Sequence, residues 1–210
     1  MKYFIRTTND RELDKSYNQI PYELIVDKDY KPIDSFIKAL YQINDEDSFL
    51  LEDDLILCND FIENSNKAIE AYPGRIINFF QSPPIYQPIK ETYIIQFNQC
   101  TFYPKGIAKQ IADIMINEPR KEGSKRNMYS LLEQKALKEL DVKVVQYRPH
   151  LVQHLDTTTL LFDNPPIGWR RSLYFIDYLK ELGITYEEAS SYRDKLIGTM
   201  RKHFKKILQK

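Results

Sequence analysis

The stretch Asp47-Ser48-Phe49-Leu50-Leu51-Glu52-Asp53-Asp54-Leu55-Ile56-Leu57 carries the fold prediction. A short apolar run leads into three consecutive carboxylates, after which the apolar pattern resumes. The run predicts a buried strand, and ligands in open α/β sheets bind beyond the carboxyl ends of such strands. Carboxylates at that edge suit a hard divalent cation, which would offset the repulsion among the acids. The alternative interpretation is an acidic turn on the surface.

The segments on both sides of this stretch alternate between strand and helix patterns. We predict strands at residues 2–8, 22–26, 75–80, 92–97 and 142–146. Helices are predicted after a cap at Asp34 or Ser35, from a cap at Asn59 or Asp60 to Ala71, and over 104–117 and 127–140, the last with Leu131 and Leu132 inward. Residues 148–163 are expected to be irregular, and two helices follow from about residue 172. The alternation predicts an α/β fold with a mostly parallel sheet.

Length and composition indicate one globular domain, alone or with a small appendage. The chain has 210 residues, 42% of them hydrophobic, and a formal net charge of +0, so no global field attracts nucleic acid or a membrane. Cys58 and Cys100 form no metal-binding motif and favour a reduced, cytoplasmic chain. No apolar run approaches the ~20 residues of a membrane span, and the N-terminus does not resemble a signal peptide. The scarce glycines form no P-loop or dinucleotide fingerprint.

The order strand, helix, Leu50-Leu51-Glu52-Asp53-Asp54-Leu55, followed much later by Pro149-His150-Leu151-Val152-Gln153-His154, resembles the GT-A glycosyltransferases. The resemblance covers the order of elements over residues 1–160 and is specific at these two motifs. It implies a Rossmann-like, nucleotide-sugar-binding domain at residues 1–164 with a mixed sheet, and a helical appendage at residues 165–210. The implied reaction moves a hexose from a nucleotide sugar, such as UDP-glucose, to an acceptor hydroxyl.

The resemblance also implies roles for residues of the two motifs. Asp54 and His154 would hold Mn²⁺ or Mg²⁺ against the diphosphate, Asp53 would contact the ribose or a metal-bound water, and Glu52 would contact the sugar or a loop. A cation there stabilises the charge that the leaving diphosphate gains. His150 is interpreted as a structural, hydrogen-bonded histidine.

Polar residues after the first two predicted strands are candidates for binding the nucleotide. A hydroxyl or a guanidinium at the carboxyl edge of a strand suits such a ligand, although a solvated loop is an even alternative. The candidates are Arg6, Thr7, Thr8, Arg11, Asp27 and the motif residue Asp53.

The general base is the role for which the resemblance gives no aligned residue. Inverting members carry an acid just before the helix that precedes the histidine motif, whereas residues 123–128 contain none. Glu122, Glu133 and Asp156 are the nearby candidates. The alternative is a retaining enzyme that relies on the leaving phosphate. General-base help is typically worth 10²–10⁴ in rate.

Basic and aromatic residues near the C-terminus suggest a nucleic-acid acceptor. Trp169 lies beside Arg170 and Arg171, and residues 201–210 are rich in Lys and Arg, a pattern that can contact DNA phosphates. The segment resembles small virus-encoded transferases that modify bacteriophage DNA at hydroxymethylated pyrimidines, which would place the protein in the host cytoplasm. A solvated helix face is the alternative interpretation, and a cell-envelope glycan or glycolipid is the alternative acceptor.

Two other classes of function stay open. A nucleotidyltransferase or phosphatase would use the same acids for two-metal chemistry, but the sequence offers no second acidic cluster of equal quality. A non-catalytic binding module with a GT-A-like fold would retain the acids as vestiges.

Overall fold

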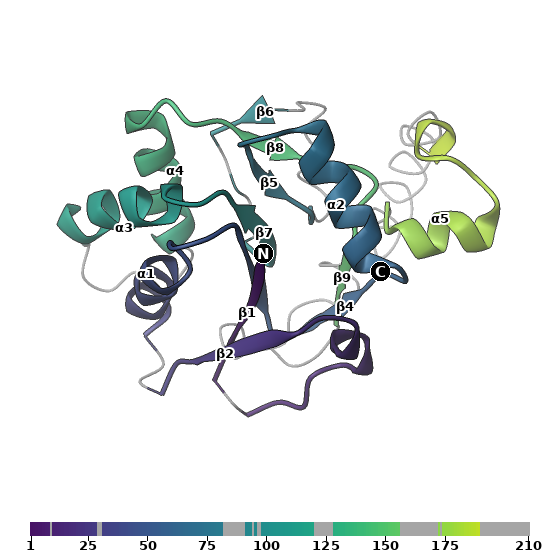
Figure 1. Ribbon diagram of the computed structural model, residues 1–210, viewed down its shortest axis with the longest axis horizontal. Helices are drawn as coiled ribbons and strands as arrows, with labels where there is room; N and C mark the ends of the chain where they lie inside the picture. Colours follow the sequence, from purple (N-terminus) through teal and green to yellow (C-terminus); the bar gives the residue numbers. More distant parts are fainter. Residues whose placement is uncertain are drawn as a thin grey trace, which may run out of the picture.

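The computed structural model describes residues 1–8, 10–28, 31–81, 91–93, 95, 98–119, 128–155, 172 and 174–189. In this part of the chain the fold is α/β (Figure 1). The main sheet contains, in spatial order, β2 (Tyr22–Val26), β1 (Lys2–Thr7), β3 (Ser48–Glu52), β7 (Cys100–Tyr103), β5 (Ile76–Asn78), β8 (Val144–Gln146) and β6 (Glu91–Thr92). A small second sheet pairs β4 (Leu55–Leu57) with β9 (Val152–His154).

The main sheet is mixed. β1 runs parallel to β2 and β3, and β5 runs parallel to β8. β7 is antiparallel to both β3 and β5, and β6 is antiparallel to β8. Five strands therefore share one direction and two oppose it, but three of the six pairings are antiparallel. The α/β class and the mixed sheet are confirmed, whereas the sheet is less parallel than predicted.

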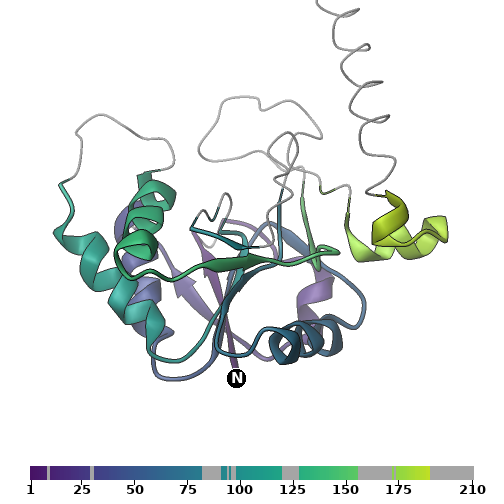
Figure 2. The ribbon, with the colours of Figure 1, turned by 90° about the horizontal axis from the view of Figure 1, so that it is seen from above.

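Helices cover both faces of this sheet (Figure 2). One face carries α1 (Pro32–Gln42), α3 (Ile107–Asn117) and α4 (Met128–Glu139), and the other carries α2 (Phe61–Ala71) and the 3₁₀ helix η1 (Lys15–Gln19). Side chains of a strand alternate between faces, so Phe4 and Leu50 pack against α1 while Tyr3, Ile5 and Phe49 pack in the cluster that contains α2 residues. β1 and β3 are thus buried between two cores.

The helices lie in the predicted regions, but they differ from the prediction in the residues at which they begin or in how those residues cap them. α1 begins at Pro32, ahead of the predicted caps, because proline suits the first helical position. Asp60 does occupy the N-cap of α2, with a left-handed φ of 57° and no side-chain capping bond. α3 begins at Ile107 rather than at Pro104, since Gly106 precedes it with a φ of 87°.

The structure differs from the predicted local structure in four places. The strand predicted at residues 92–97 is reduced to β6, and Tyr93 and Ile95 lie outside any strand. The central strand β7 was not predicted at all, and β9 lies in a region expected to be irregular. Leu131 is 63% exposed instead of inward-facing, because its neighbour Leu132 takes the buried position on α4.

The C-terminal part contains α5 (Ile176–Leu182) and a helical turn at residues 186–189. Every helix that the structure describes is too short or too polar to traverse a bilayer. The basic segment 201–210 and the group Trp169, Arg170 and Arg171 lie outside the described residues.

Candidate functional site

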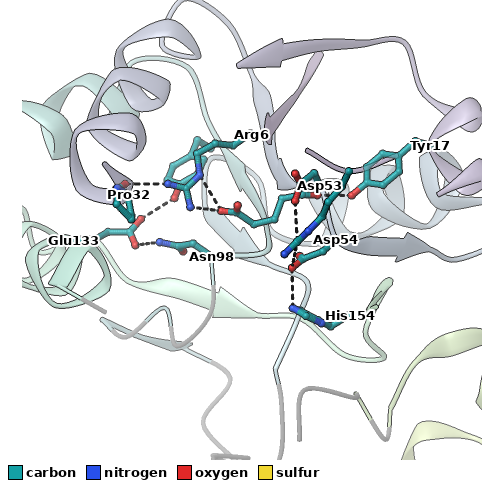
Figure 3. A network of polar contacts seen from close by, with 11 residues as sticks. Arg6, Tyr17, Pro32, Asp53, Asp54, Asn98, Glu133 and His154 are labelled. Carbon is teal, nitrogen blue, oxygen red and sulfur yellow. Dashed lines mark hydrogen bonds and ion pairs between the residues drawn. The ribbon is translucent and has the colours of Figure 1, made fainter. Parts of the chain in front are cut away.

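The predicted acidic stretch lies at the carboxyl end of β3. Figure 3 shows the side chains of Asp53 and Asp54 there, with His154 beside Asp54. β3 is fully buried up to Glu52, and the chain then bends through Asp53 and Asp54 before β4 begins. The bend is held from both sides: the amide of Glu52 donates to the Gln99 carbonyl at 2.9 Å, and the Tyr17 hydroxyl donates to the Glu52 carbonyl. Asp53 and Asp54 are 7% and 9% exposed, which excludes a surface acidic turn.

The structure brings Asp54 and His154 together. Nε2 of His154 lies 3.2 Å from Oδ2 of Asp54, and the imidazole is almost fully buried. Pairing of β4 with β9 sets this contact, because Leu55 is opposite His154 and the amide of Leu155 donates to the Asp54 carbonyl at 2.8 Å. Burial acts to raise the pKa of Asp54, but the hydrogen bond and charge of His154 and the nearby Arg11 outweigh it, so that pKa is lowered.

Asp53 is held by a hydroxyl and a guanidinium from the segment that follows β1. The Thr7 hydroxyl donates to Oδ2 of Asp53 at 2.7 Å. Nη1 of Arg11 lies 3.3 Å from Oδ1 of Asp53 and 2.9 Å from Oδ2 of Asp54, so one guanidinium joins the two carboxylates. Thr7 and Arg11, both predicted nucleotide-site residues, therefore both contact Asp53, a third residue of that predicted set.

Glu52 and Arg6 form a separate buried ion pair. Nε of Arg6 donates to Oε1 of Glu52 at 3.1 Å, and Nη1 donates to the Pro32 carbonyl at 3.0 Å. The guanidinium also lies over the rings of Phe36 and Tyr129, at 5.4 and 5.2 Å from their centroids. Burial raises the pKa of Glu52, against the opposing pull of Arg6. In this arrangement the two side chains position β1 and β3 against α1.

Glu133 lies in the interior on α4, away from His154 (Figure 3). Its carboxylate accepts hydrogen bonds from Asn98 and, at 2.7 Å, from the Tyr103 hydroxyl. Burial raises its pKa to about 7, although both hydrogen bonds act in the opposite direction. That pKa would suit a general base, yet the side chain is 0% exposed. Its catalytic role stays a prediction.

The remaining predicted nucleotide residues line the same edge of the sheet. The amide of Asp27, just past β2, donates to the Thr7 carbonyl at 2.8 Å, which places Asp27 beside the end of β1. Thr8 follows directly, and its buried hydroxyl has no hydrogen-bond partner within the described residues. Asp156, another candidate base, lies outside those residues, and so does Glu122.

A second set of polar residues, which sequence reasoning missed, holds β9 in place. Gln153 accepts hydrogen bonds from the amides of Ser172 (2.6 Å) and His154 (3.1 Å), and its Nε2 donates to the Ser172 carbonyl at 3.1 Å. The Ser172 hydroxyl contacts Nδ1 of His150 and accepts from the Tyr174 amide. Burial lowers the pKa of His150 to about 3, so this histidine is neutral, in agreement with its predicted structural role.

Asp54 and His154 fit a single divalent cation. Two ligands bound at about 2.1 Å and at right angles lie about 3.0 Å apart, and the observed separation is 3.2 Å. Among the described residues, no three His, Cys, Asp or Glu side chains form a cation-binding group. A two-ligand site keeps coordination positions for substrate phosphates, which is how Mg²⁺ is usually bound.

No protein-family model matches the chain. A search of curated proteins also finds no significant match.

Proposed function

We propose that the chain is a metal-dependent glycosyltransferase of the GT-A type, which transfers a hexose from a nucleotide sugar such as UDP-glucose to an acceptor hydroxyl. The observation that carries the proposal is the contact between Asp54 and His154 at the carboxyl edge of β3. It pairs the two motifs on which the resemblance rests, although they lie far apart in sequence. The mixed α/β sheet is compatible with the Rossmann-like fold that this proposal requires.

In the proposed site, Asp54 and His154 hold Mn²⁺ or Mg²⁺, which stabilises the charge of the departing diphosphate when it is bound. The backbone of β4 and β9 sets the separation of the two side chains before any ligand arrives. Such preorganisation avoids a reorganisation cost at the moment of reaction. His154 can bind a cation through Nε2, the atom that faces Asp54.

The nucleotide is proposed to lie along the ends of β1 and β2. Thr8 and Asp27 flank Thr7 there, and Thr7 fixes one oxygen of Asp53. The buried Thr8 hydroxyl offers a hydrogen bond to a ligand that replaces water at this edge. Asp53 then contacts the ribose or a metal-bound water, while Arg6 and Glu52 keep the underlying strands in register.

For the general base, the burial of Glu133 favours Asp156, which follows His154 by two residues. A base must lie within hydrogen-bond reach of the hydroxyl that it deprotonates, and the Glu133 carboxylate is enclosed by Asn98 and Tyr103. A retaining reaction that needs no such base is the alternative.

For the acceptor, we propose a hydroxymethylated pyrimidine in DNA, with Arg170, Arg171 and residues 201–210 on the phosphates. The support is the sequence pattern of basic residues beside Trp169. Transfer of labelled sugar to hydroxymethylated DNA, compared with unmodified DNA, tests this choice. Label on neither DNA would make a cell-envelope glycan or glycolipid the leading acceptor.

A thermal-unfolding panel tests the proposed function. UDP-glucose and other nucleotide sugars are added with and without Mn²⁺ to the wild type, to Asp54→Asn and to Glu12→Gln, which removes an exposed carboxylate from the segment that contains Arg11. A ligand at 100 times its Kd adds about 2.7 kcal/mol of stability. We expect Mn²⁺-dependent stabilisation of the wild type and Glu12→Gln, but not of Asp54→Asn. Stabilisation of all three proteins without Mn²⁺ would contradict the proposal.

A further inference from the structure

Arg11 places a positive charge against the two adjacent carboxylates Asp53 and Asp54. Its Nη1 is within 3.3 Å of Asp53 Oδ1 and 2.9 Å of Asp54 Oδ2. The side chain is 19% exposed, whereas those of the two acids are 9% and 12% exposed. A single guanidinium thus shields two adjacent, nearly buried carboxylates, one of which also contacts His154.

The backbone at Arg11 belongs to neither a helix nor a strand, while the elements on both sides are fixed. β1 ends at Thr7, and η1 begins at Lys15 with Asp14 as its N-cap, where the Asp14 side chain accepts from the Ser16 amide at 2.8 Å. η1 is in turn tied to β4, because the Leu57 amide donates to the Ser16 hydroxyl at 2.9 Å. Arg11 can therefore change its partners while β1 and η1 keep their places.

We propose that Arg11 is an exchangeable cation. In the metal-free protein it pairs with Asp53 and Asp54. When a divalent ion binds Asp54, Arg11 leaves that carboxylate and binds the diphosphate of the donor. This inference rests on the proposed function. It assigns Arg11 a regulatory part in that site, as the residue that couples metal binding to donor binding.

The charges support this exchange. Glu52 is balanced by Arg6, so Asp53 and Asp54 are the two carboxylates that need compensation at the bend. For Asp53, Asp54 and Arg11 alone, one guanidinium leaves a net charge of about −1, whereas adding a divalent ion gives about +1. The first state attracts a cation and the second attracts a diphosphate anion. A guanidinium is well suited to the second task because its planar fork binds phosphate oxygens in a bidentate manner.

The proposal predicts effects of opposite sign on two ligands. Without Arg11, the metal no longer competes with a resident cation, so Mn²⁺ binds more tightly to the nucleotide-free protein. The donor loses its guanidinium, so UDP binds more weakly to the Mn²⁺-saturated protein. An arginine that merely supports the local structure would weaken both ligands when removed.

The experiment measures Mn²⁺ binding without nucleotide, and UDP binding at saturating Mn²⁺, by calorimetry for the wild type, Arg11→Gln, Arg11→Lys and Lys15→Gln. Lys15→Gln is the matched control because it removes an exposed cation from the start of η1, with the same change of net charge. For Arg11→Gln we expect Mn²⁺ affinity to rise roughly five- to tenfold and UDP affinity to fall about tenfold, the scale of one hydrogen-bonded ion pair. Arg11→Lys should recover most of the Mn²⁺ effect and only part of the UDP effect.

The outcomes separate this inference from the proposed function. Wild-type protein that binds neither Mn²⁺ nor UDP would overturn the proposed function and the inference with it. Normal wild-type binding, together with unchanged or weakened Mn²⁺ binding in Arg11→Gln, would overturn the inference alone. Equal changes in Arg11→Gln and Lys15→Gln would also overturn it, because a general field effect would then explain them.

Discussion

Asp54 and His154 are brought to 3.2 Å by the antiparallel ladder of β4 and β9, in which Leu55 is opposite His154. Asp54 directly precedes β4, and the Leu155 amide that follows His154 bonds back to the Asp54 carbonyl. The small sheet therefore holds His154, a residue from the second half of the chain, beside the central acidic bend. No local sequence feature indicates this contact.

The first prediction concerns the two proposed metal ligands. Asp54→Asn and His154→Gln should each lower Mn²⁺ affinity by more than the roughly 10–100-fold that is typical of changes in outer-shell residues. Because His154 and Arg11 lower the pKa of Asp54, its ionised form stabilises the fold, and that contribution is lost as pH falls through the lowered pKa. Asp54→Asn should therefore not raise the free energy of unfolding at pH 7 without metal, even though it removes one of three adjacent negative charges. Calorimetric titration and urea unfolding in a chelating buffer measure both quantities.

The control for the first prediction is Glu12→Gln, an exposed acid on the same segment as Arg11. It should leave the Mn²⁺ affinity within about twofold of the wild type, since exposed charges are screened. Undiminished Mn²⁺ binding by either ligand variant would remove the proposed site.

The second prediction separates the structural acid from the metal-binding acids. Glu52→Gln breaks a buried ion pair and leaves Arg6 uncompensated, so we expect a loss of about 3–5 kcal/mol in the free energy of unfolding. Mn²⁺ affinity should change far less than in Asp54→Asn, because Glu52 contacts Arg6 rather than His154. Urea unfolding and Mn²⁺ titration of the same preparations give both numbers.

A double replacement provides the check on that reasoning. Arg6→Met combined with Glu52→Leu removes both charges, and replacing a buried pair with apolar residues is often neutral or stabilising. The double variant should therefore recover much of the stability that Glu52→Gln loses. A double variant that is less stable than Glu52→Gln would show that the ion pair itself, and not the uncompensated charge, dominates.

The sequence predicted those parts of the fold whose signal is local. β1, β2 and β3 and the main helices follow from the periodicity of apolar residues, and the acidic bend follows from its unusual run of charges. β7 escaped prediction because its four residues, Cys100–Tyr103, are too few to show a clear apolar run or a polar alternation. The pairing of Arg6 with Glu52 depends on the register between β1 and β3, and that of His154 with Asp54 depends on β9. Such register is a property of tertiary packing, which a single sequence does not display.

The third prediction concerns the hydrogen bonds between β9 and the C-terminal segment. Gln153→Leu removes the acceptor and donor that hold the Ser172 backbone and the His154 amide, so it should cost about 1–3 kcal/mol per buried group left unsatisfied. It should also weaken Mn²⁺ binding, because His154 is then less firmly positioned. Denaturant unfolding and Mn²⁺ titration are the measurements.

Ser172→Ala is the comparison for Gln153→Leu. It removes the hydroxyl that contacts His150 and Tyr174 but keeps the backbone groups that Gln153 uses. Stability should fall, whereas Mn²⁺ affinity should stay close to that of the wild type. An equal loss of Mn²⁺ affinity in both variants would mean that Gln153 has no special part in positioning His154.

The fourth prediction uses the pH dependence of stability. Burial raises the pKa of Glu133 from 4.5 to about 7, so the folded protein keeps a proton that the unfolded chain releases between these values, and stability falls as pH rises through this window. Burial lowers the pKa of His150 from 6.5 to about 3. The unfolded chain therefore binds a proton that the folded protein does not, and this contribution lowers stability as the pH drops below about 6.5. The two contributions oppose each other between pH 4.5 and 6.5.

Glu133→Gln removes one of the two opposing contributions and keeps a neutral side chain of the same shape. The amide oxygen can accept from Tyr103, and a half-turn of the Asn98 amide offers its oxygen to the new donor. Relative to the wild type, the free energy of unfolding of Glu133→Gln should therefore rise with pH, by roughly 3 kcal/mol between pH 4.5 and pH 8. Tyr103→Phe should have the opposite effect on the pH dependence. Loss of the hydroxyl removes a hydrogen bond that lowers the Glu133 pKa, so the free energy of unfolding should keep falling to a higher pH than in the wild type. Urea unfolding at pH 5, 6.5 and 8 measures these differences. If the free energy of unfolding of Glu133→Gln and of the wild type changed with pH in parallel, Glu133 would be ionised over this whole range and the prediction would be wrong.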